Sequence, residues 1–310
     1  MRVGELFAGI GGIGVGFEQA GFDVVWANEQ DAKAAITYQA NLPNTRLLVG
    51  KMETLDPSVL EDIDVLTAGF PCQAFSVAGK RQGFGDERGN VFFDILRYIS
   101  VLQPKAVLLE NVKNLISHDS TNTFRVIRSE LEELGYNIVY KVLNTAEYTD
   151  VPQNRERIFI IGFKDPDHTS GFVWPDPVSA TRGIRELLES SVDESYFYDG
   201  SRYNPQLIAE MTNPNTVYQW RRTYARENKS GLCPTLTANM GTGGHNVPLV
   251  LDGARVRKLT PRECARFQGY PDDYVLPELS NAHLYKQIGN SVSVPVVKLL
   301  AEEMRRVMNV

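Results

Sequence analysis

Short apolar runs and amphipathic segments alternate along residues 1–163. The apolar runs at 2–7, 22–27, 47–49, 63–68, 106–109, 138–143 and 158–163 predict strands. Apolar residues recur with helical spacing at 15–20, 32–40, 91–102 and 124–134, which predicts helices. This part of the chain is therefore predicted to have an α/β fold.

The pattern weakens from Lys164, where proline, asparagine and glycine residues interrupt it. We predict a smaller, loop-rich domain over residues 176–282 and a larger domain formed by residues 1–175 and 283–310. Within the smaller domain, Thr260, Pro261 and Glu263 are typical of an N-capped helix that a glycine ends. A last helix is predicted to run to about Met308.

Composition favours a globular protein, with 43% hydrophobic and 23% charged residues in a chain of 310. No apolar run approaches the roughly 18 residues of a membrane span, and the N-terminus does not have the layout of a signal peptide. Cys72, Cys233 and Cys264 form neither a zinc pattern nor a disulfide framework, which suits a reducing cytoplasm.

The net charge of −6 argues, taken alone, against a nucleic-acid partner. A local basic face can still bind nucleic acid, and two runs, 221–229 and 255–266, are locally basic. The simpler interpretation of either run is a solvated face.

A glycine-rich turn over residues 7–14 separates the first predicted strand from the first predicted helix, and the second strand ends at Glu29. In a Rossmann-like half-domain, such glycines allow close approach of a nucleoside, and the acid binds its ribose hydroxyls. The spacing lacks Gly-x-Gly-x-x-Gly and no phosphate-binding Gly-Lys-Ser/Thr follows, which favours a nucleoside without a pyrophosphate. The alternative is a glycine turn used only for packing.

Cys72 follows the apolar run at 63–68, and Pro71 restricts the backbone just before it. A thiol held there can attack a bound substrate, or it can be a buried structural cysteine. The following loop, residues 77–90, carries four glycines among charged residues. It is predicted to be either a lid or an ordinary surface loop.

Three further charged residues come next to predicted strands. Glu110 follows the apolar run at 106–109, where a carboxylate is costly unless it is paired or functional. Arg155 and Arg157 stand two residues apart on an extended segment, so their side chains are predicted to point to the same side. They could meet Glu110 or a phosphate, or form a salt bridge at a sheet edge.

These motifs, in this order, resemble those of the DNA (cytosine-5) methyltransferases of bacterial type II restriction–modification systems. The order is a Phe-x-Gly-x-Gly-Gly turn, a Pro-Cys loop, Glu-Asn-Val, Gln-x-Arg-x-Arg, Arg-x-Leu-Thr-x-Arg-Glu-Cys-Ala-Arg and Gly-Asn-Ser-Val, over residues 7–295. The resemblance implies a Rossmann-like methyltransferase domain, with a mixed, mostly parallel sheet and helices on both faces. Beside it, residues 176–282 would form a target-recognition domain.

The resemblance also implies the reaction. A methyl group would pass from S-adenosylmethionine to carbon 5 of a cytosine flipped out of a short specific site in double-stranded DNA, leaving S-adenosylhomocysteine. Cys72 matches the nucleophile that adds to carbon 6, and Glu110 matches the acid that contacts N3 and the 4-amino group. Arg155 and Arg157 match the arginines that hold the base and its phosphate.

Cofactor-binding residues implied by the resemblance are Phe7, Gly9, Gly11, Gly12, Glu29, Gln30, Pro71, Val91, Asn290 and Ser291. Two positions depart from the family pattern. Gln30 stands where an aromatic residue usually contacts adenine, and Lys51 stands where an acid commonly meets the adenine amino group. We therefore expect S-adenosylmethionine to bind with differently made adenine contacts.

The loop at 79–89 matches the active-site lid of the family. DNA contacts are expected from Ser76, Ala78, Lys80, Arg81, Thr235, Thr237 and Gly243, and from the basic residues Arg221, Arg222 and Arg226. The resemblance further implies a cytoplasmic monomer on DNA with no metal and no membrane association. A cognate restriction endonuclease acting on the same site is a possible partner.

Three alternatives stay open. A transfer-RNA cytosine-5 methyltransferase carries the same motifs with a shorter recognition region. A catalytically silent DNA-binding relative would be expected to lose Cys72 or Glu110, and both are present. A nucleotide-dependent oxidoreductase would explain the glycine turn alone.

Overall fold

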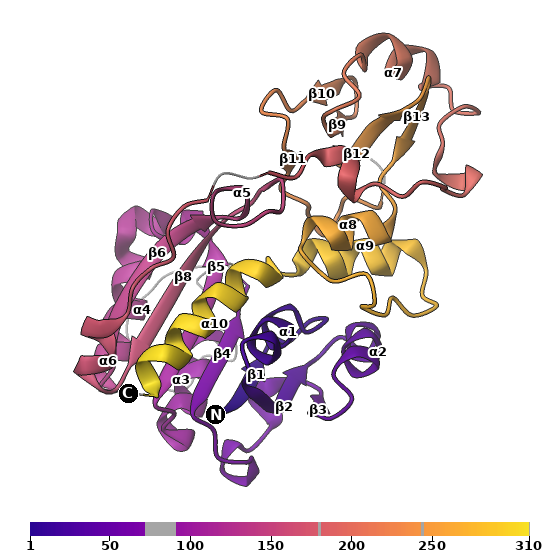
Figure 1. Ribbon diagram of the computed structural model, residues 1–310. Helices are drawn as coiled ribbons and strands as arrows, with labels where there is room; N and C mark the ends of the chain where they lie inside the picture. The colour runs from indigo at the N-terminus through magenta and orange to yellow at the C-terminus, as the bar shows by residue number, and fades with distance from the viewer. Residues whose placement is uncertain (72–90, 179–180, 243–244, 310) are drawn as a thin grey trace. The chain divides into compact units, whose positions relative to one another are not determined.

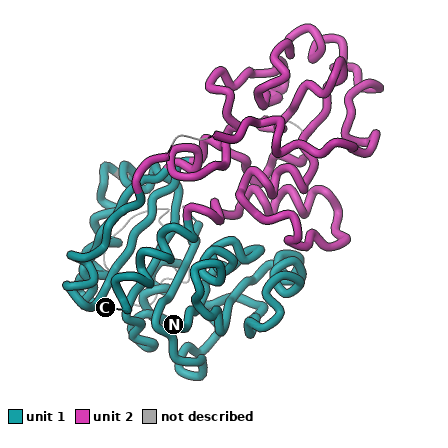
Figure 2. Tube along the Cα trace, viewed as in Figure 1, with its two compact units in different colours: residues 1–143, 156–175, 297–310 teal, residues 144–155, 176–296 magenta. Residues whose placement is uncertain are grey.

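The computed structural model describes residues 1–71, 91–178, 181–242 and 245–309. Contacts divide the chain into two units, which Figure 2 colours separately. The first unit contains Met1–Leu143, Glu156–Pro175 and Val297–Val310, and the second contains Asn144–Arg155 and Asp176–Val296. Residues 144–155 and 283–296 thus group with the second unit, whereas the predicted larger domain includes them.

The first unit is built on a seven-stranded sheet with the order β3-β2-β1-β4-β5-β8-β6 (Figure 1). Strands β1 to β5 pair in parallel, and β8 runs antiparallel to β5. The predicted mixed, mostly parallel sheet is confirmed. Its strands are β1 (Arg2–Leu6), β2 (Asp23–Glu29), β3 (Arg46–Val49), β4 (Val65–Gly69), β5 (Ala106–Val112), β6 (Asn137–Asn144) and β8 (Glu156–Phe163).

Helices cover both faces of this sheet: Figure 1 shows α10 in front of it and α3 and α4 behind it. The helices are α1 (Gly12–Gln19), α2 (Ala32–Asn41), α3 (Val91–Leu102), α4 (Asn122–Glu133), α6 (Pro166–Gly171) and α10 (Val294–Met308). Short 3-10 turns are Met52–Thr54, Pro57–Val59, Lys113–Leu115 and His118–Thr121. The bounds predicted for α3 are confirmed, whereas α1 begins at Gly12 and not at Val15, because the glycine turn itself enters the helix.

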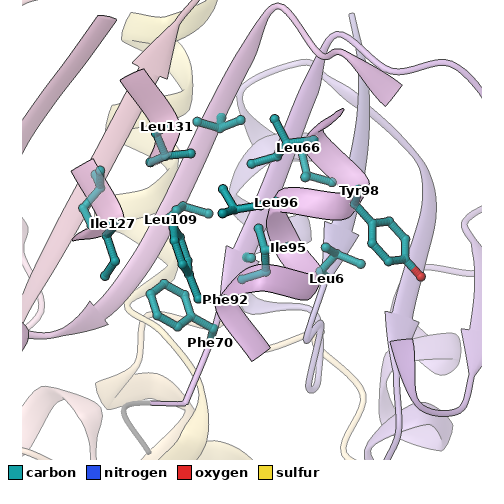
Figure 3. Packing of buried hydrophobic residues seen from close by; sticks show 14 of the residues in the cluster. Leu6, Leu66, Phe70, Phe92, Ile95, Leu96, Tyr98, Leu109, Ile127 and Leu131 are labelled. Atoms are coloured by element: carbon teal, nitrogen blue, oxygen red, sulfur yellow. The ribbon is translucent and has the colours of Figure 1, made fainter. Parts of the chain in front are cut away.

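The core of the first unit lies between the sheet and helices α3 and α4, as Figure 3 shows. Leu109 of β5 packs into it together with Phe92 of α3 and Ile127 of α4. The neighbouring strand residue Leu108 points to the opposite face and is also fully buried. A strand covered on both faces reads as a continuous apolar run, which is why the sequence pattern located it.

The second unit contains a four-stranded antiparallel sheet with the order β10-β9-β12-β13. Its strands are β9 (Tyr218–Arg221), β10 (Ala225–Glu227), β12 (His245–Asp252) and β13 (Arg255–Lys258). A short parallel pair joins β7 (Gln153–Asn154) to β11 (Cys233–Pro234). The helices are α5 (Thr145–Tyr148), α7 (Asn204–Glu210), α8 (Pro261–Phe267) and α9 (Asn281–Asn290), with 3-10 turns at Ile184–Leu187 and Glu194–Tyr196.

The N-capped helix predicted in this unit is confirmed as α8. The Thr260 hydroxyl accepts a hydrogen bond from the Glu263 amide at 3.1 Å, and the Glu263 carboxylate accepts one from the Thr260 amide at 2.8 Å. Gly269, with φ +81°, follows the helix. The sheet and helix α9 were not predicted, because their short elements carry polar residues that weaken the periodicity.

Candidate active site

Glu110 and Arg157 form an ion pair near the C-terminal end of β5, inside the central sheet. The Arg157 Nε atom lies 3.0 Å from the Glu110 Oε1 atom, and the two side chains are 16% and 13% exposed. β8 places Arg157 opposite Val112, two residues beyond Glu110 on β5. Of the partners left open for the two arginines, Glu110 is the one that Arg157 meets, and this contact fixes the orientation of a carboxyl group that lies close to solvent.

The end of β4 lies directly beside Glu110. Gly69 pairs with Glu110 in the parallel register, and the Glu110 Oε2 atom lies 3.7 Å from where a Cβ atom on Gly69 would be. The buried Asn111 side chain donates a hydrogen bond to the Phe70 carbonyl at 3.0 Å, and the Phe70 ring packs against Phe92 at 6.1 Å between centroids. The backbone is therefore held in place up to the residue before Pro71.

Six predicted site residues lie outside the described residues: Cys72 and the DNA-contact candidates Ser76, Ala78, Lys80, Arg81 and Gly243. The predicted lid at 79–89 lies outside them as well. Pro71, an implied cofactor contact, is described and exposed.

Arg155 has partners different from those of Arg157. It belongs to the second unit, is 2% exposed, and donates to the backbone carbonyls of Leu236, at 3.0 Å, and Ser291. The prediction that both arginines point to one side is wrong, because β7 ends at Asn154 and β8 begins at Glu156, so no strand spans the two. These contacts give Arg155 a positioning role that the sequence did not indicate.

The glycine turn has the backbone geometry of a close-approach site. Phe7, Gly9 and Gly11 have φ values of +55°, +57° and +82°, a region that favours glycine. A Cβ atom on Gly11 would lie 2.5 Å from Leu42, whereas one on Gly9 would meet no described atom within 4 Å. Gly11 therefore packs closely against Leu42 at the end of α2, and the space beside Gly9 is open to a ligand.

Glu29 ties this turn to the end of β2. Its two carboxylate oxygens accept hydrogen bonds from the backbone amides of Gly9 and Asp31, each at 2.7 Å. Gln30, beside it, is exposed, and so is Lys51, whereas Val91 at the start of α3 is half-buried. The half-buried acid is thus held next to the open space of the turn.

Glu5 is a buried acid that the motifs of the sequence do not indicate. It is fully buried at the end of β1, and accepts hydrogen bonds from the Gly14 amide and the Tyr38 hydroxyl, each at 3.1 Å. Burial raises its pKa to about 8. An acid inside the predicted strand at 2–7, between the apolar Val3 and Leu6, was the available signal.

The residues of the Gly-Asn-Ser-Val motif lie in the second unit. Asn290 is exposed at the end of α9, and the Ser291 hydroxyl lies 2.5 Å from the Tyr270 hydroxyl. A Cβ atom on Gly289 would lie 2.2 Å from the backbone of Thr237, so only glycine allows this helix to pack there. The Thr237 hydroxyl donates to Asn239 at 2.7 Å. 

The DNA-contact candidates that the structure describes also lie in the second unit. The Thr235 hydroxyl donates to the Asn154 carbonyl at 2.7 Å. Arg221, at the end of β9, donates to the Asn246 side chain, and Arg222 and Arg226 are exposed. The structure thus keeps the three arginines on one hairpin but gives them different surroundings.

In the second basic run, 255–266, three of the five basic residues form ion pairs with acids. Arg257 is fully buried and forms a two-bond ion pair with the equally buried Glu263, both bonds at 2.8 Å. Arg255 pairs with Glu194 at 2.5 Å, and Arg266 pairs with Asp272 at 2.6 Å. The expected solvated face is therefore wrong for Arg257, whose charge supports the internal structure of this unit.

Within the described ranges, no group of three histidine, cysteine, aspartate or glutamate side chains could hold a metal ion. Among the helices that the structure describes, none has both the length and the apolar character that crossing a bilayer requires.

Comparisons with known proteins agree with the order of the motifs. The profile of one family, described as C-5 cytosine-specific DNA methylase, matches residues 1–306. The chain is 52% identical to a Type II methyltransferase, M.Bsp6I, of Bacillus sp. (strain RFL6), over 99% of each chain. It is 43% identical to the Type II methyltransferase M.NgoBI of Neisseria gonorrhoeae, over 95% of this chain and 90% of that relative.

A solved structure supports the fold. The Dnmt2 methyltransferase of S. pombe superposes with a TM-score of 0.77 and 20% identity, covering 100% of both chains.

Proposed function

The chain belongs to the C-5 cytosine-specific DNA methylase family and is a DNA cytosine-5 methyltransferase, and on that basis we propose how its residues carry out the reaction. The methyl donor is S-adenosylmethionine, which supplies an electrophilic methyl group, and S-adenosylhomocysteine is the product. The substrate is a cytosine extruded from duplex DNA, since carbon 5 cannot be reached inside the base stack.

Cys72 is the proposed nucleophile. Its thiolate sulfur adds to carbon 6 of the cytosine, which turns the unreactive carbon 5 into part of a nucleophilic enamine. Gly69, three residues earlier, pairs with Glu110, and three residues span at most about 11 Å of chain. This short tether, and the hydrogen bond that Asn111 donates to the Phe70 carbonyl, support a thiol kept within reach of the acid.

Glu110 is the proposed acid. A proton donated from its carboxyl group to N3 of the cytosine neutralises the charge that forms when the sulfur adds. Arg157, 3.0 Å away, orients this carboxyl group. Carbon 5 takes the methyl group and S-adenosylhomocysteine is released. A base then removes the carbon 5 proton, the carbon–sulfur bond breaks to regenerate the thiolate, and N3 returns its proton to the Glu110 carboxylate.

The residues of the glycine turn fit the donor. The open space beside Gly9 accommodates a ligand at the backbone. Two amide hydrogen bonds hold Glu29 beside this space, where its carboxylate can accept hydrogen bonds from ribose hydroxyls. Phe7, Gly11, Gly12, Pro71 and Val91 would line the same site, while Gln30 and Lys51 would replace the usual adenine contacts. Asn290 and Ser291 are proposed contacts from the second unit.

The second unit is proposed to recognise the DNA site, with Thr235, Thr237, Gly243, Arg221, Arg222 and Arg226 as contacts. Ser76, Ala78, Lys80 and Arg81 are proposed contacts from the segment after Cys72. Because the similar bacterial proteins are named Type II methyltransferases, we infer that this enzyme protects host DNA from a restriction endonuclease that cuts the same site. It would act as a monomer in the cytoplasm.

The ion pair between Glu110 and Arg157, next to the strand that leads to Cys72, is the observation that carries this proposal. Bisulfite sequencing of DNA from cells that express the protein should identify the methylated site. A duplex with 5-fluorocytosine at that position should then trap the protein covalently in the presence of S-adenosylmethionine. Carbon 5 then carries fluorine where a base would remove a proton, so the carbon–sulfur bond cannot break by elimination.

Substitutions of Cys72 and Glu110 separate the roles of the nucleophile and the acid. Cys72→Ser should form no covalent complex, and Glu110→Gln should form it at least 100-fold more slowly. Glu53→Gln, a matched change at an exposed glutamate of the first unit, should behave like the parent. Methylation by Cys72→Ser at the parent rate would disprove the mechanism, and transfer of label to RNA in place of DNA would disprove the substrate.

Protection is tested separately. Genomic DNA from expressing cells should resist an endonuclease that cuts the mapped site, while DNA from cells expressing Cys72→Ser should be cut. Cleavage of both would contradict the inferred protective role without affecting the chemistry.

A further inference from the structure

The hairpin formed by β9 and β10 presents an unusual turn. Residues 222–224 connect its strands, and the Arg221 amide donates to the Tyr224 carbonyl at 2.9 Å. Arg222 has φ +72°, a left-handed conformation that glycine or asparagine adopts at much lower cost than arginine. Because other non-glycine residues of the described chain also have positive φ values, this conformation makes the Arg222 side chain a candidate for a function that its surroundings must support.

Helix α7 holds the backbone of this turn. The Gln206 side chain donates to the Thr223 carbonyl at 2.6 Å, and the Glu210 carboxylate accepts from the Ala225 amide at 2.6 Å. Gln206 also donates to Glu210 at 2.7 Å, which links the two supports. The turn is thus fixed through its backbone, and this support does not depend on the Arg222 side chain.

The three arginines of the hairpin differ in their freedom to bind a ligand. Arg221 is half-buried and donates to Asn246, which itself has φ +71° at an irregularity in β12. Arg226 is exposed within β10, where its backbone pairs with Gln219. Arg222 is exposed at the turn, and within the described part of the chain its guanidinium group has neither a hydrogen bond nor an ion pair.

The shape and chemistry of this element fit the edge of a base. A two-stranded β-ribbon fits the major groove of B-DNA, and an arginine there can donate two hydrogen bonds to O6 and N7 of guanine. A rigid turn that places one unpaired guanidinium group ahead of its strands is suited to such a contact. We propose that Arg222 reads a guanine of the methylated site, an inference that rests on the proposed function and assigns one residue the task of discrimination.

The test uses the full-length protein and two substitutions. Arg222→Gly removes the guanidinium group and also relieves the left-handed strain, so its urea midpoint should equal or exceed that of the parent. Its kcat/KM on the mapped site should nevertheless fall about 5- to 150-fold, the range for losing a two-bond base contact. Arg46→Ala removes an exposed arginine of the first unit and should leave rate and stability unchanged.

Specificity is measured on duplexes in which each base pair of the mapped site is replaced in turn. Arg222→Gly should lose discrimination at one guanine position and keep it at the others. Unchanged site preference would overturn the proposal. So would a uniform loss of affinity with a salt dependence reduced by about one counterion, since that pattern indicates a phosphate contact.

The activity of the parent enzyme separates a failure of the Arg222 proposal from a failure of the proposed function. If the parent methylates DNA and Arg222→Gly shows the same rates and site preference, only the role of Arg222 fails. If the parent transfers no methyl group to any DNA, the proposed function itself fails.

Discussion

Glu5 makes the stability of the first unit dependent on pH, and a single substitution tests this. Its carboxyl group is fully buried beneath the glycine turn, and burial raises its pKa from 4.5 to about 8. In the unfolded chain the same group titrates near its ordinary value. Between these two values the folded state binds more protons than the unfolded state, so the free energy of unfolding falls as the pH rises.

The magnitude follows from the shift. Each pH unit between 4.5 and about 8 should lower the free energy of unfolding by up to about 1.4 kcal/mol, or roughly 5 kcal/mol across the whole window. Glu5→Gln keeps the shape and an acceptor for the Tyr38 hydroxyl or the Gly14 amide but does not ionise. At pH 5 it should match the parent within about 1 kcal/mol, and its relative stability should increase as the pH rises.

Urea unfolding at pH 5.5, 6.5, 7.5 and 8.5, followed by tryptophan fluorescence, measures the effect; Trp26 is fully buried in the same unit. The exposed Glu53→Gln variant is the control and should follow the parent at every pH. Parallel stability curves for the parent and Glu5→Gln would refute the reasoning, because they would mean that Glu5 does not change its proton affinity on folding.

Three further predictions concern other buried or paired groups. Glu110→Gln should lower kcat at least 100-fold with an unchanged urea midpoint; a matching loss of stability would contradict a catalytic role. Asn111→Ala leaves the Phe70 carbonyl without its donor and should cost about 1–3 kcal/mol in unfolding experiments. Glu263→Ala leaves the fully buried Arg257 guanidinium with Asp252 as its remaining ion-pair partner and should cost up to about 3–5 kcal/mol; a cost below about 1 kcal/mol would contradict this expectation.

The sequence predicted those parts of the fold in which periodicity and burial agree. β5 is covered on both faces, so its residues form an uninterrupted apolar run, and α3 has one strong apolar face, so its ends were located correctly. The Thr260 cap was predictable because capping needs particular residues at fixed spacing, independent of distant contacts.

The four-stranded sheet of the second unit could not be predicted in this way. β9 carries Gln219 and Arg221 on the face opposite the apolar cluster of Tyr218 and Trp220, and β10 has only three residues. β13 contains Arg257, whose burial depends on Glu263 in a helix that follows it. A charge that is neutralised by a partner outside its own strand cannot be distinguished from a solvated one by local pattern.

The same limit applied to the candidate site. The sequence left open whether Arg157 meets Glu110 or a phosphate, and the register of β5 and β8 brings Arg157 to Glu110. Spacing alone also grouped Arg155 with Arg157, although the strand is interrupted between them. The role of Glu5 was missed because an acid in an apolar strand can be recognised as buried only when its hydrogen-bond partners, Gly14 and Tyr38, are known.

Arg155 shows that a residue of a catalytic motif can act through the structure of its own unit. Its guanidinium group joins the carbonyls of Leu236 and Ser291, which lie 81 and 136 residues away in the chain. Gly289 packs on the backbone of Thr237 in the same unit, so the Gly-Asn-Ser-Val motif meets a predicted DNA-contact residue there. Removing Arg155 would leave two carbonyl acceptors without their donor, each at a cost of about 1–3 kcal/mol. Loss of methylation in an Arg155→Ala variant would therefore not identify a substrate contact unless the urea midpoint were preserved.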